Sequence, residues 1–198
     1  MKKKQTLKEI FVEAFQNYKN GDLKKSESIC YKILNIEPNH FDSIFLLATI
    51  SAINNNFDKA KQLLHKAIEI KPENVSAYNN LGTACKELGD HKGAINYYNK
   101  VLEINPKHTN AYYNLGLVFY KLKEMEKAKS YFQKTIDLQP NYVLAFFNLA
   151  NIYVELKDFE NAVSCYQKAT KLNPNLIGAH NNLGLVFRVL NDFENAIR

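Results

Sequence analysis

The sequence predicts an all-α protein, an α-solenoid made of antiparallel helix pairs, and three observations carry this prediction. Hydrophobic residues make up 46% of the 198 residues, which is enough to bury a core and argues against disorder. The chain has only 7 Gly and 5 Pro, too few for the frequent turns of an all-β protein. The five prolines follow one another at intervals of 34 residues, which indicates a repeat of that length.

The prolines define where each repeat begins and ends. They are Pro38, Pro72, Pro106, Pro140 and Pro174. With proline at position 32 of each repeat, the chain divides into five full repeats and a truncated sixth, preceded by a basic arm at residues 1–6. The repeats are 7–40, 41–74, 75–108, 109–142, 143–176 and 177–198. Residues are compared below by their position within this repeat.

Two positions of the repeat hold small residues throughout. Position 8 holds Ala14, Ala48, Gly82, Gly116, Ala150 and Gly184. Position 20 holds Ser26, Ala60, Ala94, Ala128, Ala162 and Ala196. Larger apolar residues occupy positions 7 and 24, and Glu13 is the exception at position 7. Because small residues let two helix backbones approach closely, this pattern predicts an antiparallel helix pair in each repeat.

Hydrophobic periodicity supports two helices per repeat. In the fourth repeat, apolar residues recur at helical spacing before and after the expected turn. They are Tyr112, Leu115, Phe119 and Leu122, then Ala128, Phe132, Thr135 and Ile136. For the first repeat the predicted helices span residues 7–20 and 23–37, and later pairs follow every 34 residues.

The predicted turns lie at positions 15 and 32. Position 15 holds Gly21, Asn55, Gly89 and Asn191 in four of the repeats. These residue types tolerate the left-handed backbone that commonly ends a helix. Lys123 and Lys157 depart from the pattern and should lower stability there. Proline at position 32 ends the second helix, because it lacks the N–H donor and restricts the residue before it.

These features together resemble the tetratricopeptide repeat. The segments that carry the resemblance are AYNNLG, AYYNLG, AFFNLA and AHNNLG, each in register with the alanine at position 20, and the resemblance covers residues 7–198. The first repeat is the least typical, with Glu13 and Ser26 at signature positions, as expected for a terminal cap. The resemblance implies a right-handed superhelix whose first helices line a concave groove, where ligands bind mainly at positions 2, 5, 6, 9, 12 and 13.

Position 6 is the most regular of these groove positions. It holds Asn80, Asn114, Asn148 and Asn182 in four consecutive repeats. An Asn amide has a donor and an acceptor, so it can pair with both polar groups of a peptide backbone. With first helices roughly 10 Å apart and a strand rising ~3.3 Å per residue, one Asn would meet every third peptide residue. This resembles the asparagine ladder of the O-linked N-acetylglucosamine transferase repeat domain; the alternative is a consensus residue without a role in binding.

The other groove candidates differ between the two ends of the chain. The later repeats add Asn79, Lys86, Tyr113, Tyr120, Phe147, Asn151 and Arg188. The first two repeats offer an apolar surface instead, formed by Phe11, Phe15, Phe45, Leu46 and Ile53. Exposed apolar surface of this kind suggests a hydrophobic partner segment, contact with the N-terminal arm, or a second chain. The alternative is that the assignment of faces is one position off in these repeats.

Charge and composition restrict the partners. The net charge is +6, but nearly all of it comes from lysine, and Arg188 and Arg198 are the only arginines. Because arginine dominates the recognition of phosphate and base edges, nucleic acid is not the expected partner. No apolar stretch reaches the ~20 residues of a membrane span, and no signal peptide is recognisable. The three scattered cysteines, Cys30, Cys85 and Cys165, favour a reducing compartment, so we expect a cytoplasmic protein.

Nothing in the sequence suggests catalysis, a metal or another cofactor. The five histidines fall at repeat positions 34, 25, 17, 34 and 4, with no ligand spacing among them. The sequence also has no glycine-rich phosphate loop and no nucleophile elbow. We therefore expect a binding protein rather than an enzyme.

The leading hypothesis is a scaffold that binds a protein or an extended peptide in its groove. One alternative is the substrate-recognition region at the N-terminus of a larger enzyme, such as a glycosyltransferase or a sulfotransferase. Another is a homo-oligomer that associates through the apolar groove or through an open C-terminal end. The apolar residues at that end are Phe187, Leu190, Phe193, Ala196 and Ile197.

Overall fold

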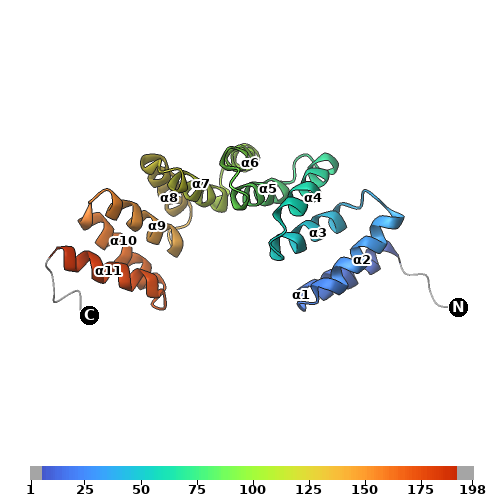
Figure 1. The fold of residues 1–198 in the computed structure, drawn as a ribbon, viewed down its shortest axis with the longest axis horizontal. Helices are drawn as coiled ribbons and strands as arrows, with labels where there is room; N and C mark the ends of the chain where they lie inside the picture. Colours follow the sequence, from blue (N-terminus) through green and yellow to red (C-terminus); the bar gives the residue numbers. More distant parts are fainter. Residues whose placement is uncertain (1–5, 191–198) are drawn as a thin grey trace. The chain divides into compact units, whose positions relative to one another are not determined.

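The computed structural model describes residues 6–190, and every regular element in that part of the chain is a helix (Figure 1). The helices are α1 (Leu7–Lys19), α2 (Leu23–Ile36), α3 (Phe41–Ile53), α4 (Phe57–Ile70), α5 (Val75–Glu87), α6 (His91–Ile104), α7 (Thr109–Lys121), α8 (Met125–Leu138), α9 (Val143–Glu155), α10 (Phe159–Leu172) and α11 (Ile177–Val189). The all-α prediction is confirmed. The first helices of the repeats start 34 residues apart, as the prolines indicate.

Some predictions concern residues outside this range. They are the basic arm before Thr6, and the helix end and apolar residues predicted at Asn191, Phe193, Ala196 and Ile197. Thr6 itself belongs to α1, where it forms a capping box with Glu9. None of the helices between residues 6 and 190 is both long and apolar enough to cross a membrane.

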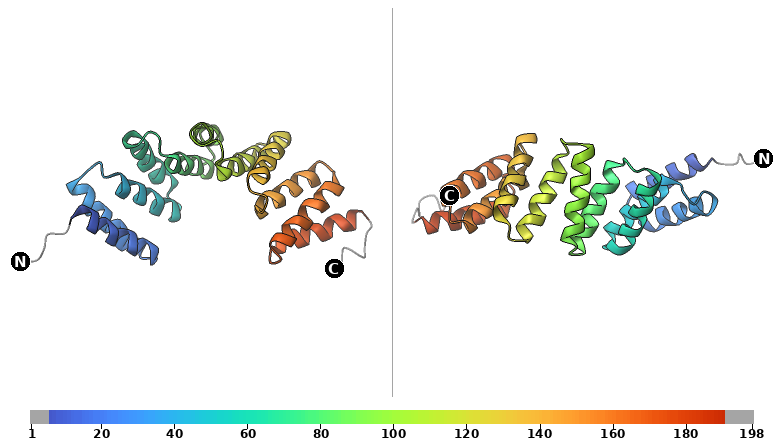
Figure 2. Two further views of the ribbon diagram at one scale, coloured as in Figure 1. Left: turned by 180° about the vertical axis from the view of Figure 1, so that it is seen from behind. Right: turned by 90° about the horizontal axis from the view of Figure 1, so that it is seen from above.

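The chain forms two compact units, and each is a stack of helix pairs (Figure 2). Unit 1 is Met1–Pro106 and contains α1 to α6, whereas unit 2 is Lys107–Arg198 and contains α7 to α11. Within each unit a second helix packs against the first helix of its own repeat and against the first helix of the next. This is the packing expected of a solenoid, in which each repeat contacts its neighbours.

Polar side chains at positions 34 and 16 start most of the helices. At position 34, His40 Nδ1 accepts from the Ser43 N–H at 3.2 Å, and His108 Nδ1 accepts from the Ala111 N–H at 3.2 Å. At position 16, Asp90 caps α6 through the Gly93 N–H at 2.9 Å. Such caps satisfy backbone donors that a helix cannot pair internally. Two of the five histidines therefore have a structural role.

Position 15 adopts the left-handed conformation in every repeat for which it is described. The φ angles are 82° at Gly21, 57° at Asn55, 77° at Gly89, 63° at Lys123 and 60° at Lys157. The predicted helix ends are confirmed, including those at the two lysines. There, the position in the repeat determines the conformation against the preference of the residue.

Replacing Lys157 with glycine is expected to stabilise the protein by about 1 kcal/mol, because a left-handed backbone costs a non-glycine residue about 1–2 kcal/mol and glycine loses part of this gain through entropy. Lys123→Gly should gain less, since Lys123 Nζ lies 3.3 Å from Glu155 and 5.4 Å from the Tyr120 ring centroid. Urea denaturation followed by circular dichroism measures both. A lower midpoint for Lys157→Gly would contradict the prediction.

The small residues at position 8 face the large residues at position 24 of the same repeat. A Cβ atom added to Gly82 would lie 2.6 Å from the ring of Tyr98, and one added to Gly116 would lie 2.6 Å from the ring of Phe132. Both rings are completely buried. The close approach that the small residues predict is therefore present, and in these two repeats it leaves no room for a methyl group.

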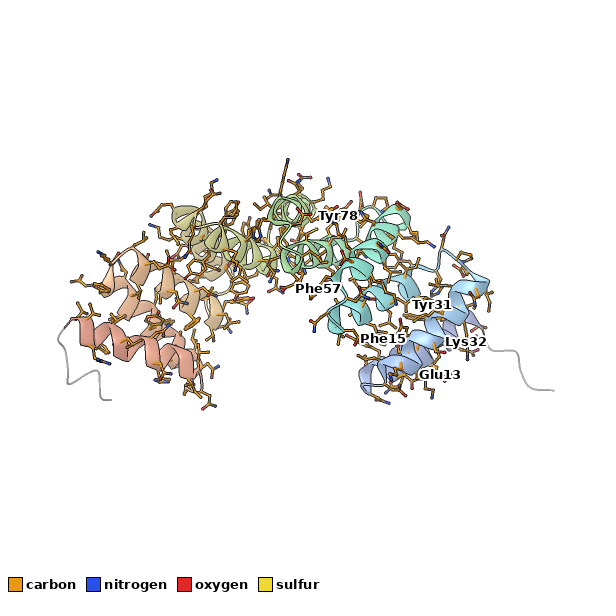
Figure 3. All side chains as sticks on the ribbon, viewed as in Figure 1. Glu13, Phe15, Tyr31, Lys32, Phe57 and Tyr78 are labelled. Carbon is orange, nitrogen blue, oxygen red and sulfur yellow. The ribbon has the colours of Figure 1, made fainter. Side chains whose placement is uncertain are left out.

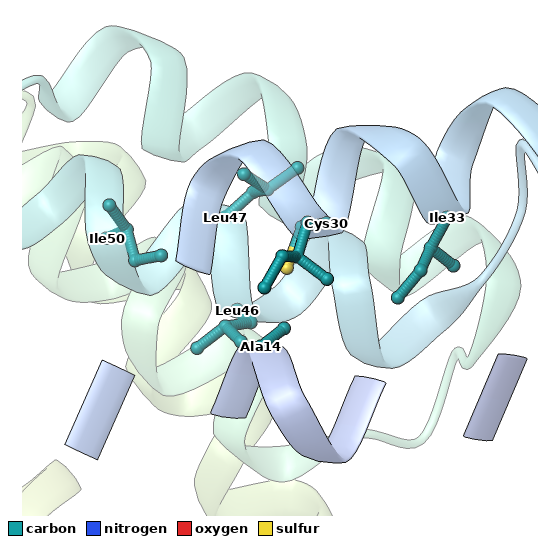
Figure 4. Packing of buried hydrophobic residues seen from close by; sticks show 7 residues of the cluster. Ala14, Cys30, Ile33, Leu46, Leu47 and Ile50 are labelled. Carbon is teal, nitrogen blue, oxygen red and sulfur yellow. The ribbon is translucent and has the colours of Figure 1, made fainter. Parts of the chain in front are cut away.

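The core of the first two repeats contains one residue that we expected on the surface. Leu46 is only 5% exposed and lies in a cluster between α1, α2 and α3 (Figure 4). The other members are Ala14, Ile29, Cys30, Ile33, Leu47 and Ile50. The prediction of Leu46 as part of an apolar contact surface is wrong, because α1 packs against α3 as well as against α2 and covers this position.

The remaining residues of that apolar set are accessible to different degrees. Phe15 and Ile53 are exposed, whereas Phe11 and Phe45 are half-buried against the hydrophobic core. Glu13, the exception at position 7, lies on the outer side of α1 (Figure 3) and is exposed. A charged residue is therefore compatible with position 7 in this repeat, although the leucines at position 7 of the next four repeats are buried or half-buried.

Candidate peptide-binding surface

Each unit has a pocket on the side formed by its first helices, which we call its groove face. The unit 1 pocket has a volume of about 470 Å³ and is lined by Tyr18, Ala48, Thr49, Ala52, Ile53, Asn55, Phe57, Leu64, Asn80, Thr83, Ala84 and Glu87. The unit 2 pocket has a volume of about 380 Å³ and is lined by Tyr120, Asn151, Val154, Glu155, Phe159, Tyr166, Asn182, Leu185, Val186 and Val189. Both are within the size range of binding sites for small ligands or single side chains.

The two pockets are formed by the same repeat positions. Every lining residue of the unit 2 pocket has a counterpart three repeats earlier that lines the unit 1 pocket. Phe159 corresponds to Phe57, and Asn182 corresponds to Asn80. The pockets therefore follow from the packing of three successive repeats, while the side chains at these positions determine what each pocket can bind.

In the unit 1 pocket the position 6 amide is free to bind. Asn80 is half-buried, and its side chain makes no hydrogen bond to any residue in the described part of the chain. The neighbouring Thr83 hydroxyl lies 3.1 Å from both the Asn79 carbonyl and the Tyr98 hydroxyl. Asn80 can thus offer both its donor and its acceptor to a ligand.

In unit 2, two position 6 amides are already engaged as donors. Asn148 Nδ2 donates to the Leu144 carbonyl at 2.9 Å and to the Tyr113 hydroxyl at 3.1 Å. Asn182 Nδ2 donates to Asn151 Oδ1 at 3.1 Å and to the Tyr166 hydroxyl at 3.2 Å.

Both hydrogens of each amide are therefore used, and what remains for a ligand is the oxygen. The Leu144 carbonyl fixes the orientation of the Asn148 amide, because a carbonyl can only accept. The expectation that an amide pairs with both groups of a peptide backbone is thus restricted to Asn80 and Asn114, whose side chains have no hydrogen bond among residues 6–190.

The unit 2 pocket also contains a carboxylate. Glu155 accepts a hydrogen bond from the Tyr120 hydroxyl, and its second oxygen lies 3.3 Å from Lys123 Nζ. The Tyr120 hydroxyl, and then Lys123, lower the pKa of Glu155. Burial, together with this carboxylate, raises the pKa of Tyr120 to about 12. At neutral pH the pocket therefore holds a charged carboxylate and a neutral tyrosine.

The structure brings some of the predicted site residues together in the pockets. Tyr120, Asn151 and Asn182 line the unit 2 pocket, and Asn80 and Ile53 line the unit 1 pocket. The other candidates lie outside the two pockets. They are Phe11, Phe15, Phe45, Leu46, Asn79, Lys86, Tyr113, Asn114, Phe147, Asn148 and Arg188.

The contacts of these other candidates show how each is held. Lys86 is paired with Glu87 at 2.7 Å, and the Tyr113 ring packs on Tyr142 with ring centroids 4.9 Å apart. The Phe147 ring packs on that of Tyr166 at 6.0 Å. These residues support the groove faces, and they are less accessible than their repeat positions suggested.

Sequence analysis missed several pocket residues. Glu155 lies at position 13, a groove position of the resembled family, so this signal was present in the sequence. Phe57 and Phe159, at position 17, and Tyr166, at position 24, come from second helices. Figure 3 shows Phe57 on the side of unit 1 opposite to Tyr78. The recurring aromatic residue at position 17 could have indicated that second helices contribute to the groove face.

The titratable residues between positions 6 and 190 show no sign of a reactive or metal-binding centre. No group of three or more His, Cys, Asp or Glu side chains in this range could hold a metal ion. All three cysteines are free thiols, and burial raises the pKa of Cys30 and of Cys165 to about 11. Such thiols are weak nucleophiles at neutral pH.

Family models match most of the chain. A model described as TPR repeat matches residues 82–123 and 150–188, and two models described as tetratricopeptide repeat match 109–142 and 131–164. A model of subunit 3 of the anaphase-promoting complex, or cyclosome, matches residues 19–101. A search of curated proteins gave no match.

Solved structures with low sequence identity share the fold. MamA is 24% identical, with a TM-score of 0.75, and the match covers 81% of this chain and 94% of MamA. YrrB, described as a TPR protein with an unusual peptide-binding site, is 21% identical, with a TM-score of 0.71 and coverage of 86% and 88%. PilW, described as a widely conserved type IV pilus biogenesis factor, is 20% identical, with a TM-score of 0.84 and coverage of 98% and 90%. At these identities the matches establish the fold alone.

Proposed function

We propose, from the premise that this chain contains tetratricopeptide repeats, that it is an interaction scaffold that binds a protein or an extended peptide on its groove faces. The observation that carries the proposal is the presence of equivalent pockets in both units. Each pocket has an apolar wall and a few polar groups, the composition typical of binding sites. The protein acts by binding, with no reaction of its own.

The solved relatives support the same kind of function. YrrB is described as having a peptide-binding site, and PilW as a factor in pilus biogenesis. The three free cysteines fit a reducing compartment, so we place the scaffold in the cytoplasm.

Peptide backbone recognition is the proposed role of position 6. Asn80 and Asn114 can both donate and accept, while Asn148 and Asn182 offer an oxygen to peptide N–H groups. An extended peptide presents N–H and C=O groups in alternation, so each amide finds a partner wherever it meets the chain. The likeness to the asparagine ladder of the O-linked N-acetylglucosamine transferase repeat domain is part of this proposal.

Replacing both Asn80 and Asn114 with alanine is expected to weaken peptide binding by about 1 kcal/mol per lost hydrogen bond. Stability should change little, because neither amide is bonded within the described chain. The peptide is one selected from a random decapeptide display library, and fluorescence anisotropy measures its affinity. Asn148 and Asn182 are less suitable, since their removal also breaks internal hydrogen bonds.

The matched control replaces Asn96 and Asn99 with alanine. Both are exposed residues of α6, a second helix, and neither lines a pocket. This variant should bind the peptide as wild type does. If the Asn80/Asn114 variant also keeps full affinity, then position 6 is a consensus residue and takes no part in binding.

A further inference from the structure

The hydrogen-bond donors that line the unit 2 pocket are mostly engaged within the protein. The Tyr120 hydroxyl donates to Glu155, and the Tyr166 hydroxyl donates to Asn151 Oδ1 at 2.5 Å. Asn182 uses both hydrogens of its amide, as described above. Among the polar side chains of the pocket, only the Asn151 amide keeps its hydrogens free of a described partner.

The acceptors of the pocket remain available. Asn182 Oδ1 accepts no hydrogen bond from the described residues, and each oxygen of Glu155 has more than one lone pair. The Glu155 side chain is 36% exposed. A ligand that enters this pocket must therefore bring donors, since it meets mainly acceptors.

The charges at the pocket favour a cation. Glu155 is the one charged residue among the described lining residues, although the whole chain is basic. Its partner Lys123 is 70% exposed and does not line the pocket, and an ion pair as exposed as this one contributes little and is easily exchanged. Arg188 is exposed on α11 and also lies outside the lining.

The apolar wall suits an aliphatic stem. Val154, Phe159, Leu185, Val186 and Val189 form this wall, and the volume of about 380 Å³ exceeds that of a single side chain. Arginine and lysine combine such a stem with a cationic head that has several donors. A carboxyl-terminal or acidic ligand would instead meet a carboxylate with few donors to offset the repulsion.

We infer that the unit 2 pocket binds the side chain of an arginine or lysine in a basic peptide, with its stem on the apolar wall and its head at Glu155. This inference rests on the proposed function. It concerns unit 2 alone, because the counterpart of Glu155 in the unit 1 pocket is Ile53. The chain thus has one pocket with a carboxylate at this position and one with an apolar residue there.

Random decapeptides displayed on phage and selected on the full chain provide the probe. We expect the selected peptides to be enriched in arginine or lysine. A synthetic copy of one such peptide is then compared with copies in which the basic residue is replaced by citrulline or by norleucine. On wild type, loss of the charge should weaken binding about tenfold, as expected for a hydrogen-bonded charge. Comparing copies with arginine and lysine shows which head the pocket prefers.

Glu155→Gln keeps the shape of the side chain and its hydrogen bond from Tyr120 but removes the charge. On this variant the charged and neutral peptides should differ less than twofold. Glu160→Gln, at an exposed residue of α10 outside the pocket, should preserve the tenfold difference. Circular dichroism confirms that both variants are folded.

The outcomes separate the inference from the function on which it rests. If peptides bind but show no preference for a basic residue, or if the preference survives Glu155→Gln, the inference is overturned while the scaffold remains. If no peptide of any composition is selected, the proposed function is overturned and the inference with it.

Discussion

Replacing Phe132 with alanine is expected to lower the free energy of unfolding by about 3–5 kcal/mol, the usual cost of removing a buried aromatic ring. Phe132 is completely buried at position 24 of the fourth repeat. Its ring lies against the backbone of α7 at Gly116, so its loss leaves a cavity between α7 and α8. Urea denaturation followed by circular dichroism measures the change. A loss below 1 kcal/mol would show that the helices close over the cavity.

Gly116→Ala should have opposite effects in the two backgrounds. In wild type the new methyl group would lie 2.6 Å from the Phe132 ring, so we expect a loss of about 1–2 kcal/mol, a typical cost of overpacking. In Phe132→Ala the cavity accepts the methyl group, and alanine gains about 1 kcal/mol of helix propensity over glycine.

The control for this pair is Gly178→Ala in α11. A Cβ atom at Gly178 meets nothing closer than the Phe147 ring, at 3.6 Å. This change should be neutral or stabilising in both backgrounds. Equal effects of Gly116→Ala with and without Phe132 would mean that the two sites are independent. Ala150 and Tyr166, in one cluster in the fifth repeat, show that a small shift can accommodate the methyl group, which is why the expected cost is moderate.

Leu46→Ala is expected to destabilise the protein by about 2–5 kcal/mol, as at other buried leucines. Leu46 was predicted from its repeat position to form part of a contact surface, but it is 5% exposed within the cluster of α1, α2 and α3. Ile53→Ala is the matched change at a residue of the same predicted surface that is 50% exposed, and it should cost about 1 kcal/mol or less.

Thermal and urea unfolding of the two variants distinguish a core residue from a surface residue. Peptide binding adds a second measurement, because Ile53 lines the unit 1 pocket and Leu46 does not. We therefore expect Leu46→Ala to change stability and Ile53→Ala to change binding. Equal stabilities for the two variants would contradict the packing described for α1 and α3.

The features that the sequence predicted correctly are set by the backbone. The spacing of the prolines located all the first helices between residues 7 and 189. Position 15 located the left-handed residues even where Lys123 and Lys157 occupy it. Glycine at position 8 indicated a close approach, and at Gly116 the Phe132 ring confirms it. A strict repeat length repeats the backbone geometry, so these features follow from counting along the chain.

The features that were missed depend on side chains and on tertiary neighbours. Leu46 and Asn80 share position 6, yet α1 covers only the first of them. Asn148 and Asn80 are the same residue at the same position, but only Asn148 has Tyr113 within reach as an acceptor. A repeat position determines where a side chain starts. Which partners it finds depends on residues in adjacent repeats that vary along the chain.

The equivalence of the two pockets also has an evolutionary consequence. A duplicated site frees one copy to change while the other keeps its original chemistry. At equivalent positions unit 1 has Ile53 and Leu64, whereas unit 2 has Glu155 and Tyr166. Such divergence needs no new backbone, because both pockets are formed by the same repeat positions. New specificity can arise in this architecture by single codon changes, and the same exchanges offer a protein engineer a direct way to transfer one pocket's preference to the other.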